Sequence, residues 1–242
     1  MIPIRDLNPT RTFPFFTVLL IVANALVFAY ELGQRAISSS AIDRFYTIYG
    51  LIPCRVSNSC SPAVLGQLQA LHDPVSPAAS LFTSMFVHGG WLHIAGNMLF
   101  LWIFGNNVED LMGHARYAIF YFVCGLIATF AQIGFDPTST VPSIGASGAI
   151  AGVLGAYFVI YPRVPVDTAI FVLFVFFVRL PAWLVLGFWI ALQFFNGVAA
   201  VGAPNVGGVA TFAHIGGFLA GMVLVFLFRR RPPPKLTLPM VV

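Results

Sequence analysis

The sequence predicts an all-α polytopic membrane protein, a single domain over residues 1–242 that forms a bundle of six transmembrane helices. Three observations support this fold class. Of the 242 residues, 59% are hydrophobic and 8% are charged, whereas about 25% of the residues in a soluble domain are charged. Several apolar runs approach the roughly 20 residues that a helix needs to cross a bilayer. The lysines and arginines gather in alternate loops, as in membrane proteins. This composition excludes an ordinary soluble enzyme, a disordered chain and a nucleic-acid-binding domain.

Polar or charged breaks separate the six predicted spans. The spans cover about 13–31, 90–111, 115–135, 146–162, 181–198 and 209–228. The first apolar run is longer than that of a signal peptide, and no small-residue cleavage site follows it, so we expect a retained helix. The run 167–180 is too short to cross, and Arg179 and Pro181 end it. It is predicted to be an interfacial or re-entrant segment, with a seventh, distorted span as the alternative.

The positive charges predict that both termini lie in the cytoplasm. With the N-terminus inside, nine lysines and arginines fall on the inner side and three on the outer side. The three outer arginines all lie in one long outer loop, 32–80, and the last four basic residues form a cytoplasmic tail, 229–242. A seventh span would move this basic tail outside, against the positive-inside rule.

Two of the three cysteines lie in the outer loop. Cys54 and Cys60 stand between Pro53 and Pro62. They can form a disulfide if the loop faces an oxidising compartment, and two free thiols are the open alternative. Cys124 lies within the third predicted span and is expected to pack as a small apolar residue.

Four polar residues gather near the outer ends of the second, fourth and sixth spans. Ser147 lies in the first turn of the fourth span, and His214 lies one turn into the sixth. His93 and Asn97 are four residues apart and therefore share one face of the second span. At about 1.5 Å per residue, all four fall within roughly 10 Å of the outer surface. Because polar side chains are costly inside a membrane, each is a candidate functional residue.

The residue types suggest a nucleophilic serine with a histidine base. A serine hydroxyl needs an adjacent base to take its proton, and His214 could supply it. Glycines at 148 and 152, and at 217 and 221, have a spacing that lets helix backbones approach closely. Within the spans no acidic residue lies near His214, and Asp136 is only a remote candidate. We therefore predict a serine–histidine dyad rather than a triad.

The same cluster contains donors for a developing oxyanion. His93 and Asn97 carry side-chain N–H groups, and the first turn of the fourth span leaves backbone N–H groups near Ser147 unpaired. A metal site is not expected, because His88 and His93 are five residues apart and no cysteine or acid joins them.

Three segments of the chain resemble signature segments of the rhomboid intramembrane serine proteases. They are HGGWLHIAGN at 88–97, GASGAIAG at 145–152 and AHIGGFLAG at 213–221. The pattern of Gly105, Glu109 and Gly113 at the inner end of the second span is also similar to the family pattern. The resemblance covers about 80–228, and six spans agree with the basic family fold.

The resemblance implies roles for individual residues. Ser147 would be the nucleophile and His214 the base. The residues implied to line the oxyanion site are His93, Asn97 and the Ser147 backbone, with His88, Gly145 and Ala146 supporting the site. Phe194 and Phe195, near the outer end of the fifth span, could form part of a substrate gate.

The resemblance also implies the reaction and its setting. The substrate would be a single-pass membrane-anchored protein, cut within or just outside its transmembrane segment, which enters sideways near the second and fifth helices. No cofactor, metal or nucleic acid is implied. The protein would be a multi-pass protein of the cell (inner) membrane, with the active site near the outer face.

Two departures and two alternatives accompany this interpretation. Many family members carry a Trp-Arg pair in the first loop, which is absent here, and some place an aromatic ring where this chain has Ala151. His214 must therefore be supported in another way. A non-catalytic relative that binds transmembrane segments would typically lack the serine or the histidine. A small-molecule transporter would carry mid-membrane charges and repeated halves, and neither is seen.

Overall fold

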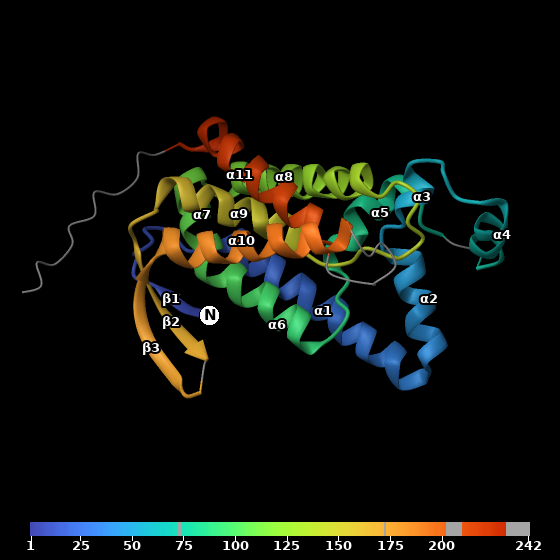
Figure 1. The fold of residues 1–242 in the computed structure, drawn as a ribbon, viewed down its shortest axis with the longest axis horizontal. Coiled ribbons are helices and arrows are strands. Elements are labelled where there is room, and N and C mark those ends of the chain that lie inside the picture. Colours follow the sequence, from blue (N-terminus) through green and yellow to red (C-terminus); the bar gives the residue numbers. More distant parts are fainter. Residues whose placement is uncertain (72–73, 172, 202–209, 231–242) are drawn as a thin grey trace, which may run out of the picture.

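The computed structural model describes residues 1–71, 74–171, 173–201 and 210–230. Its long helices run side by side in one bundle (Figure 1). Among the described residues, four helices are long and apolar enough to cross a membrane: α1 (Phe15–Ile37), α8 (His114–Phe135), α10 (Ala182–Val201) and α11 (Thr211–Phe228). A predominantly helical membrane fold is thus confirmed. The count of six crossings and the side on which the termini lie stay predictions.

The remaining two predicted spans are helical but shorter or interrupted. The fourth is α9 (Ser147–Ile160), an apolar helix of 14 residues. The second is a continuous helical stretch in three parts: α6 (Trp91–Phe100), a π-helical segment η2 (Leu101–Gly105) and α7 (Asn106–Met112). Helix α9 is buried from Ala149 to Tyr157. It therefore forms the centre of the core, against α8, α11 and η2.

A buried carboxylate joins the second helical stretch to the start of α1. Glu109 is fully buried, and its oxygens accept hydrogen bonds from the backbone N–H groups of Phe16 and Thr17, each at 2.8 Å, and from the Thr17 hydroxyl at 2.7 Å. The first N–H groups of a helix have no partner within the helix, and a carboxylate there also meets the positive end of the helix dipole. Glu109 therefore caps α1 from α7.

The predicted outer loop folds into short helices at one end of the bundle (Figure 1). They are α2 (Ser39–Tyr49), α3 (Pro53–Val56), α4 (Pro62–Ala70), α5 (Pro77–Thr83) and the short 3-10 helix η1 (Ser84–Phe86). Serine side chains at 38, 61 and 76 accept the N-terminal hydrogen bonds of α2, α4 and α5, as serine does at helix starts.

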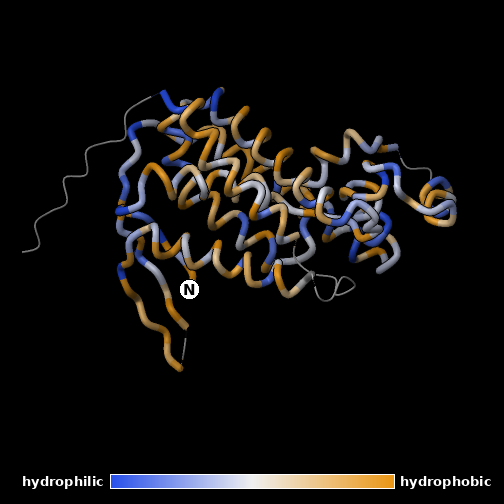
Figure 2. The backbone as a smooth tube through the Cα atoms, turned by 45° about the horizontal axis from the view of Figure 1, so that its top comes forward, coloured by the Kyte–Doolittle hydropathy of each residue, from blue (hydrophilic) through white to orange (hydrophobic). Residues whose placement is uncertain are grey.

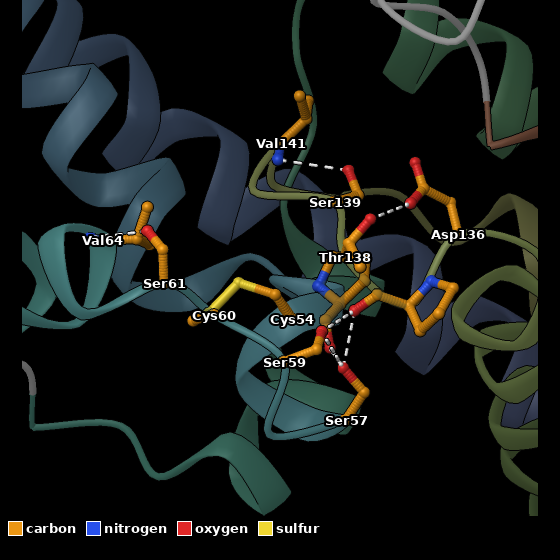
Figure 3. The surroundings of a disulfide bond; sticks show 12 residues. Cys54, Ser57, Ser59, Cys60, Ser61, Val64, Asp136, Thr138, Ser139 and Val141 are labelled. Atoms are coloured by element: carbon orange, nitrogen blue, oxygen red, sulfur yellow. Dashed lines mark hydrogen bonds between the residues drawn. A yellow bond between two sulfur atoms is a disulfide. The ribbon is translucent and has the colours of Figure 1, made fainter.

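Of the two alternatives for the outer-loop cysteines, the disulfide is the one present. Cys54 and Cys60 are bonded (Figure 3). The turn that they close donates to the segment before α9: Ser57 and Ser59 each donate a hydroxyl hydrogen bond of 2.6 Å to the Pro137 carbonyl. This disulfide-closed turn therefore supports the connection that leads to Ser147.

The segment 167–180 forms strands rather than a re-entrant helix or a seventh span, so these two alternatives are wrong, whereas an interfacial position for the segment stays a prediction. Strands β2 (Pro165–Phe171) and β3 (Val175–Pro181) form an antiparallel hairpin, and β1 (Ile2–Asp6) pairs with β2. The sheet, in the order β1-β2-β3, is an addition to the predicted all-α fold. Valine and phenylalanine dominate this segment and favour strands.

The sheet lies at the opposite end of the bundle from α2–α5, and its hairpin projects away from the helices (Figure 1). Most of the hairpin is hydrophobic (Figure 2). Charged residues hold its base, because Arg5 and Arg179 donate to the Asp167 carboxylate at 2.8 and 2.9 Å. These two guanidinium groups lower the pKa of Asp167. Residues 199–208, which join the fifth and sixth predicted spans, and the predicted tail at 229–242 lie mostly outside the described residues.

Candidate active site

The structure brings Ser147 and His214 into contact. Ser147 is the first residue of α9, and His214 lies one turn into α11. The Nε2 atom of His214 and the Oγ atom of Ser147 are 2.6 Å apart, within the range for a nucleophile and its base. His214 is 6% exposed and Ser147 is half-buried, so the contact is partly shielded from solvent. The predicted approach of these two side chains is confirmed.

Glycines on both helices make this contact possible. A Cβ atom on Gly217 would lie 2.1 Å from the Gly148 carbonyl oxygen, and one on Gly221 would lie 1.8 Å from that of Gly152. On α9, a Cβ atom on Gly155 would lie 2.0 Å from the Phe218 carbonyl oxygen. Because no side chain separates them, the backbones of α9 and α11 touch along their length. The predicted role of the glycine spacings is confirmed.

A glutamine on α10 contacts the other nitrogen of the histidine. The Oε1 atom of Gln193 lies 2.9 Å from the Nδ1 atom of His214, and Gln193 is buried. Gln193 is not among the residues predicted from the sequence. The signal was present, because Gln193 is a polar side chain within an apolar span, and that feature marked the other candidates.

Asp136 is not the third member of the site. It lies at the C-terminal end of α8, and its carboxylate accepts a hydrogen bond of 3.1 Å from Thr138 (Figure 3). In the described part of the chain Gln193, and not Asp136, lies beside the Nδ1 atom of His214. Asp136 as a remote candidate is therefore wrong, and the catalytic serine–histidine dyad stays a prediction. An amide occupies the place beside Nδ1 that a carboxylate fills in a Ser-His-Asp triad.

The ring of His214 is supported from α10 rather than from α9. Trp189 lies one turn before Gln193 on α10, and its ring centroid is 5.6 Å from that of His214. The small Ala151 on α9 cannot stack against an imidazole. The aromatic support that the sequence lacks at position 151 is thus supplied by Trp189.

His93 and Asn97, the two residues predicted to bind the oxyanion, both lie on α6. The His93 ring lies against Gly145, in the loop that precedes Ser147. A Cβ atom on Gly145 would lie 2.7 Å from the His93 Nε2 atom and 3.7 Å from the Ser147 Oγ atom. Gly145 has φ +122°, a conformation that favours glycine. The Asn97 Nδ2 atom is buried without a hydrogen-bond partner in the described part of the chain. An unpaired buried donor of this kind is suited to an anion that forms only during a reaction.

The residues expected to support the site are buried beside it. Ala146 is fully buried immediately before α9, and its carbonyl accepts the hydrogen bond of the Ile150 N–H at 3.0 Å. The backbone N–H of His88 donates to Glu31 at 2.9 Å, and the His88 ring is 5.0 Å from that of His93. Burial lowers the pKa of His88 to about 4, so its imidazole is neutral at pH 7.

A small cavity adjoins the serine. Its volume is about 30 Å³, which is enough for a water molecule or two. Ser84, Gly145 and Ser147 contribute to its lining. Leu51, between α2 and α3, and Ser143, between α8 and α9, also line it. A hydrolytic water could therefore reach Ser147 from this side.

Phe194 and Phe195 do not belong to the cluster around Ser147. They follow Gln193 on α10 and are 49% and 74% exposed, whereas Gln193 is buried against His214. Their part in a substrate gate stays a prediction.

The fold and the site define a helical membrane protein in which a serine hydroxyl contacts a buried imidazole where two apposed helices begin. The Rhomboid domain family model matches residues 77–231. The chain therefore belongs to the rhomboid family.

Named relatives agree with this assignment. RHOMBOID-like protein 1 of Arabidopsis thaliana is 28% identical over 229 residues, which are 91% of this chain and 54% of the relative. Rhomboid protein 1, mitochondrial, of Saccharomyces cerevisiae is 30% identical over 62% of this chain and 42% of its own length. Rhomboid protease GluP of Bacillus subtilis is 42% identical over 31% of this chain and 14% of its own length. The chain thus spans about half or less of the length of these relatives.

Proposed function

We propose that this protein is an intramembrane serine endopeptidase that cleaves transmembrane segments of membrane-anchored proteins. The observation that carries the proposal is the 2.6 Å contact between the Ser147 Oγ and His214 Nε2 atoms. Membership of the rhomboid family and similarity to a relative named as a rhomboid protease support it.

The residues would act in two half-reactions. In the first, His214 takes the proton of Ser147 as Oγ attacks the scissile carbonyl carbon, and the carbonyl oxygen becomes an oxyanion. His214 then gives this proton to the leaving amine as the C–N bond breaks, which leaves an acyl-serine. In the second, His214 takes a proton from water as the water attacks the acyl carbon, and it returns this proton to Ser147 as the serine leaves.

The oxyanion would be held by groups from two helices. The Asn97 Nδ2 atom is a buried donor without a protein partner in the described residues, and the Nε2 atom of His93 lies beside Gly145, next to the serine. The Ser147 N–H belongs to the unpaired first turn of α9. Because several donors share the charge, the loss of one should weaken catalysis without abolishing it.

The proposal includes six crossings with both termini in the cytoplasm. Helices α6–α7 and α9 then complete the set formed by α1, α8, α10 and α11, and the dyad lies near the outer face of a cell (inner) membrane. The basic residues of the inner loops support this orientation. A single-pass substrate would enter sideways beside α10, where Phe194 and Phe195 are exposed.

The test is labelling with a fluorophosphonate probe, together with cleavage of a tagged transmembrane substrate. The wild type should be labelled and should cleave the substrate. Ser147→Ala should do neither, His214→Ala should lose cleavage, and Asn97→Ala should cleave more slowly. Ser40→Ala, which changes an exposed outer-loop serine, is the matched control and should behave as the wild type. Labelling or cleavage by purified Ser147→Ala at the wild-type rate would overturn the proposal.

A further inference from the structure

We infer that Gln193 is a positioning residue that holds His214 in the tautomer able to accept the serine proton. The inference rests on the proposed function and extends it. The active site would then contain three members, with a neutral amide from α10 in the place of a carboxylate. This glutamine lies outside the three segments that carry the family resemblance.

The hydrogen-bond chemistry of the imidazole fixes which ring nitrogen carries the proton. A neutral imidazole carries one N–H, so one ring nitrogen donates and the other accepts. The amide oxygen of Gln193 only accepts, and it lies 2.9 Å from Nδ1. The proton must therefore reside on Nδ1. Nε2 then presents its lone pair to the Ser147 hydroxyl at 2.6 Å, which is the arrangement that a general base requires.

Helix α10 fixes the orientation of the His214 ring as well as the position of its proton. Trp189 and Gln193 are four residues apart and so share one face of α10. Trp189 packs beside the imidazole with centroids 5.6 Å apart, while Gln193 contacts Nδ1. Together they restrict the ring to the plane and the flip state in which Nε2 faces Ser147.

A charged side chain at position 193 is costly. An isolated carboxylate buried beside His214 would pay a large desolvation penalty within a membrane. An amide orients the ring without that penalty, because it carries no net charge. With an amide at position 193, the protonated His214 ring has no anionic partner there. The acid limb of the rate profile is the fall in kcat as His214 becomes protonated at low pH. A charge placed at position 193 should shift this limb along the pH axis.

Few titratable groups around His214 would obscure such a shift of the acid limb. In the described part of the chain, the titratable side chain that acts on His214 electrostatically is His93 on α6. The neutral Gln132 of α8 accepts from the Ala213 N–H at 3.3 Å, next to the histidine but not on its ring. Ser147 from α9 and Gln193 from α10 contribute neutral groups.

The experiment compares kcat and KM against pH for three variants of the full chain in detergent or vesicles. Gln193→Met removes the acceptor at similar size and should lower kcat about 10- to 100-fold with little change in KM, because the general base loses its tautomer control. Gln193→Glu keeps an acceptor and adds a charge. Gln193→Glu should recover most of the wild-type kcat and should move the acid limb to a higher pH by about one unit.

Gln132→Leu is the matched control, because it removes a neighbouring glutamine that does not contact the imidazole. Its acid limb should coincide with that of the wild type. Nitrogen NMR of ¹⁵N-histidine-labelled protein gives a readout independent of turnover, with the His214 signal identified from His214→Ala. The wild type should show a protonated Nδ1, and Gln193→Met should show a mixture of tautomers.

Each outcome bears on the inference. Wild-type kcat and pH profile in Gln193→Met would overturn it, and so would equal inactivity of Gln193→Met and Gln193→Glu with an unchanged histidine signal. If Ser147→Ala abolishes labelling in the same preparations, such a result removes only the role of Gln193. If Ser147→Ala is still labelled, the proposed function itself has failed.

Discussion

Gly221→Ala should push α11 away from α9 and slow the reaction of Ser147. The new Cβ atom would lie 1.8 Å from the Gly152 carbonyl oxygen, whereas ordinary contacts begin at 3.4 Å. The backbones must therefore separate locally by about 1.6 Å to reach ordinary contact, because a carbonyl oxygen within a helix cannot turn aside. Forcing extra atoms into a packed interior typically costs about 1–3 kcal/mol.

The same displacement reaches the dyad, because His214 lies two turns before Gly221 on the same helix. If only half of it is transmitted, the 2.6 Å contact between Nε2 and Oγ lengthens beyond about 3.2 Å, the limit for an effective base. We expect the rate of fluorophosphonate labelling to fall at least about tenfold. The midpoint of thermal unfolding in detergent should fall by several degrees.

The matched control is Gly134→Ala on α8, where an added Cβ atom meets nothing within 4 Å. Alanine also favours a helix over glycine, so this variant should be as stable as the wild type or slightly more stable. Equal labelling rates and equal unfolding midpoints for Gly221→Ala and Gly134→Ala would refute the packing argument.

Three further changes test other parts of the structure. Glu109→Ala leaves the N–H groups at the start of α1 and the Thr17 hydroxyl without their acceptor, and should lower the free energy of unfolding by about 1–3 kcal/mol. Replacing both Cys54 and Cys60 by serine should lower it by about 2 kcal/mol, as expected for a short closed loop. Burial raises the pKa of Asp6 to about 6, so the folded state favours the protonated acid. The contribution of Asp6 to the free energy of unfolding is therefore complete below about pH 4 and is lost as the pH rises through 6. Asp6→Asn should remove this pH dependence of stability.

Unfolding curves in detergent, measured from pH 4 to 7, check all three. Asp43→Ala, on the exposed side of α2, is a suitable carboxylate control for Glu109→Ala. If both variants unfold at the same midpoint, Glu109 does not stabilise the start of α1. An unchanged midpoint for the double serine variant would contradict the role given to the disulfide. For Asp6, the contradicting result is the same pH dependence in Asp6→Asn and in the wild type.

Several features follow from the sequence because they depend on local composition and spacing. A bilayer admits little besides helices, so apolar runs of sufficient length predict the long helices directly. Polar residues are rare in such runs, which singled out Ser147 and His214 before any contact was known. The glycine spacings indicated that the fourth and sixth spans approach closely, and the touching backbones of α9 and α11 confirm it.

Other features were decided only by the tertiary structure. The contact between Gln193 and His214 depends on how α10 is rotated about its own axis, and no spacing along the chain encodes that rotation. The 165–181 segment is apolar enough for a helix or a strand, and its pairing with the N-terminal β1, more than 150 residues away, selects the strand. Apolar runs show which segments avoid water, whereas contacts between helices arise from the packing of the whole bundle.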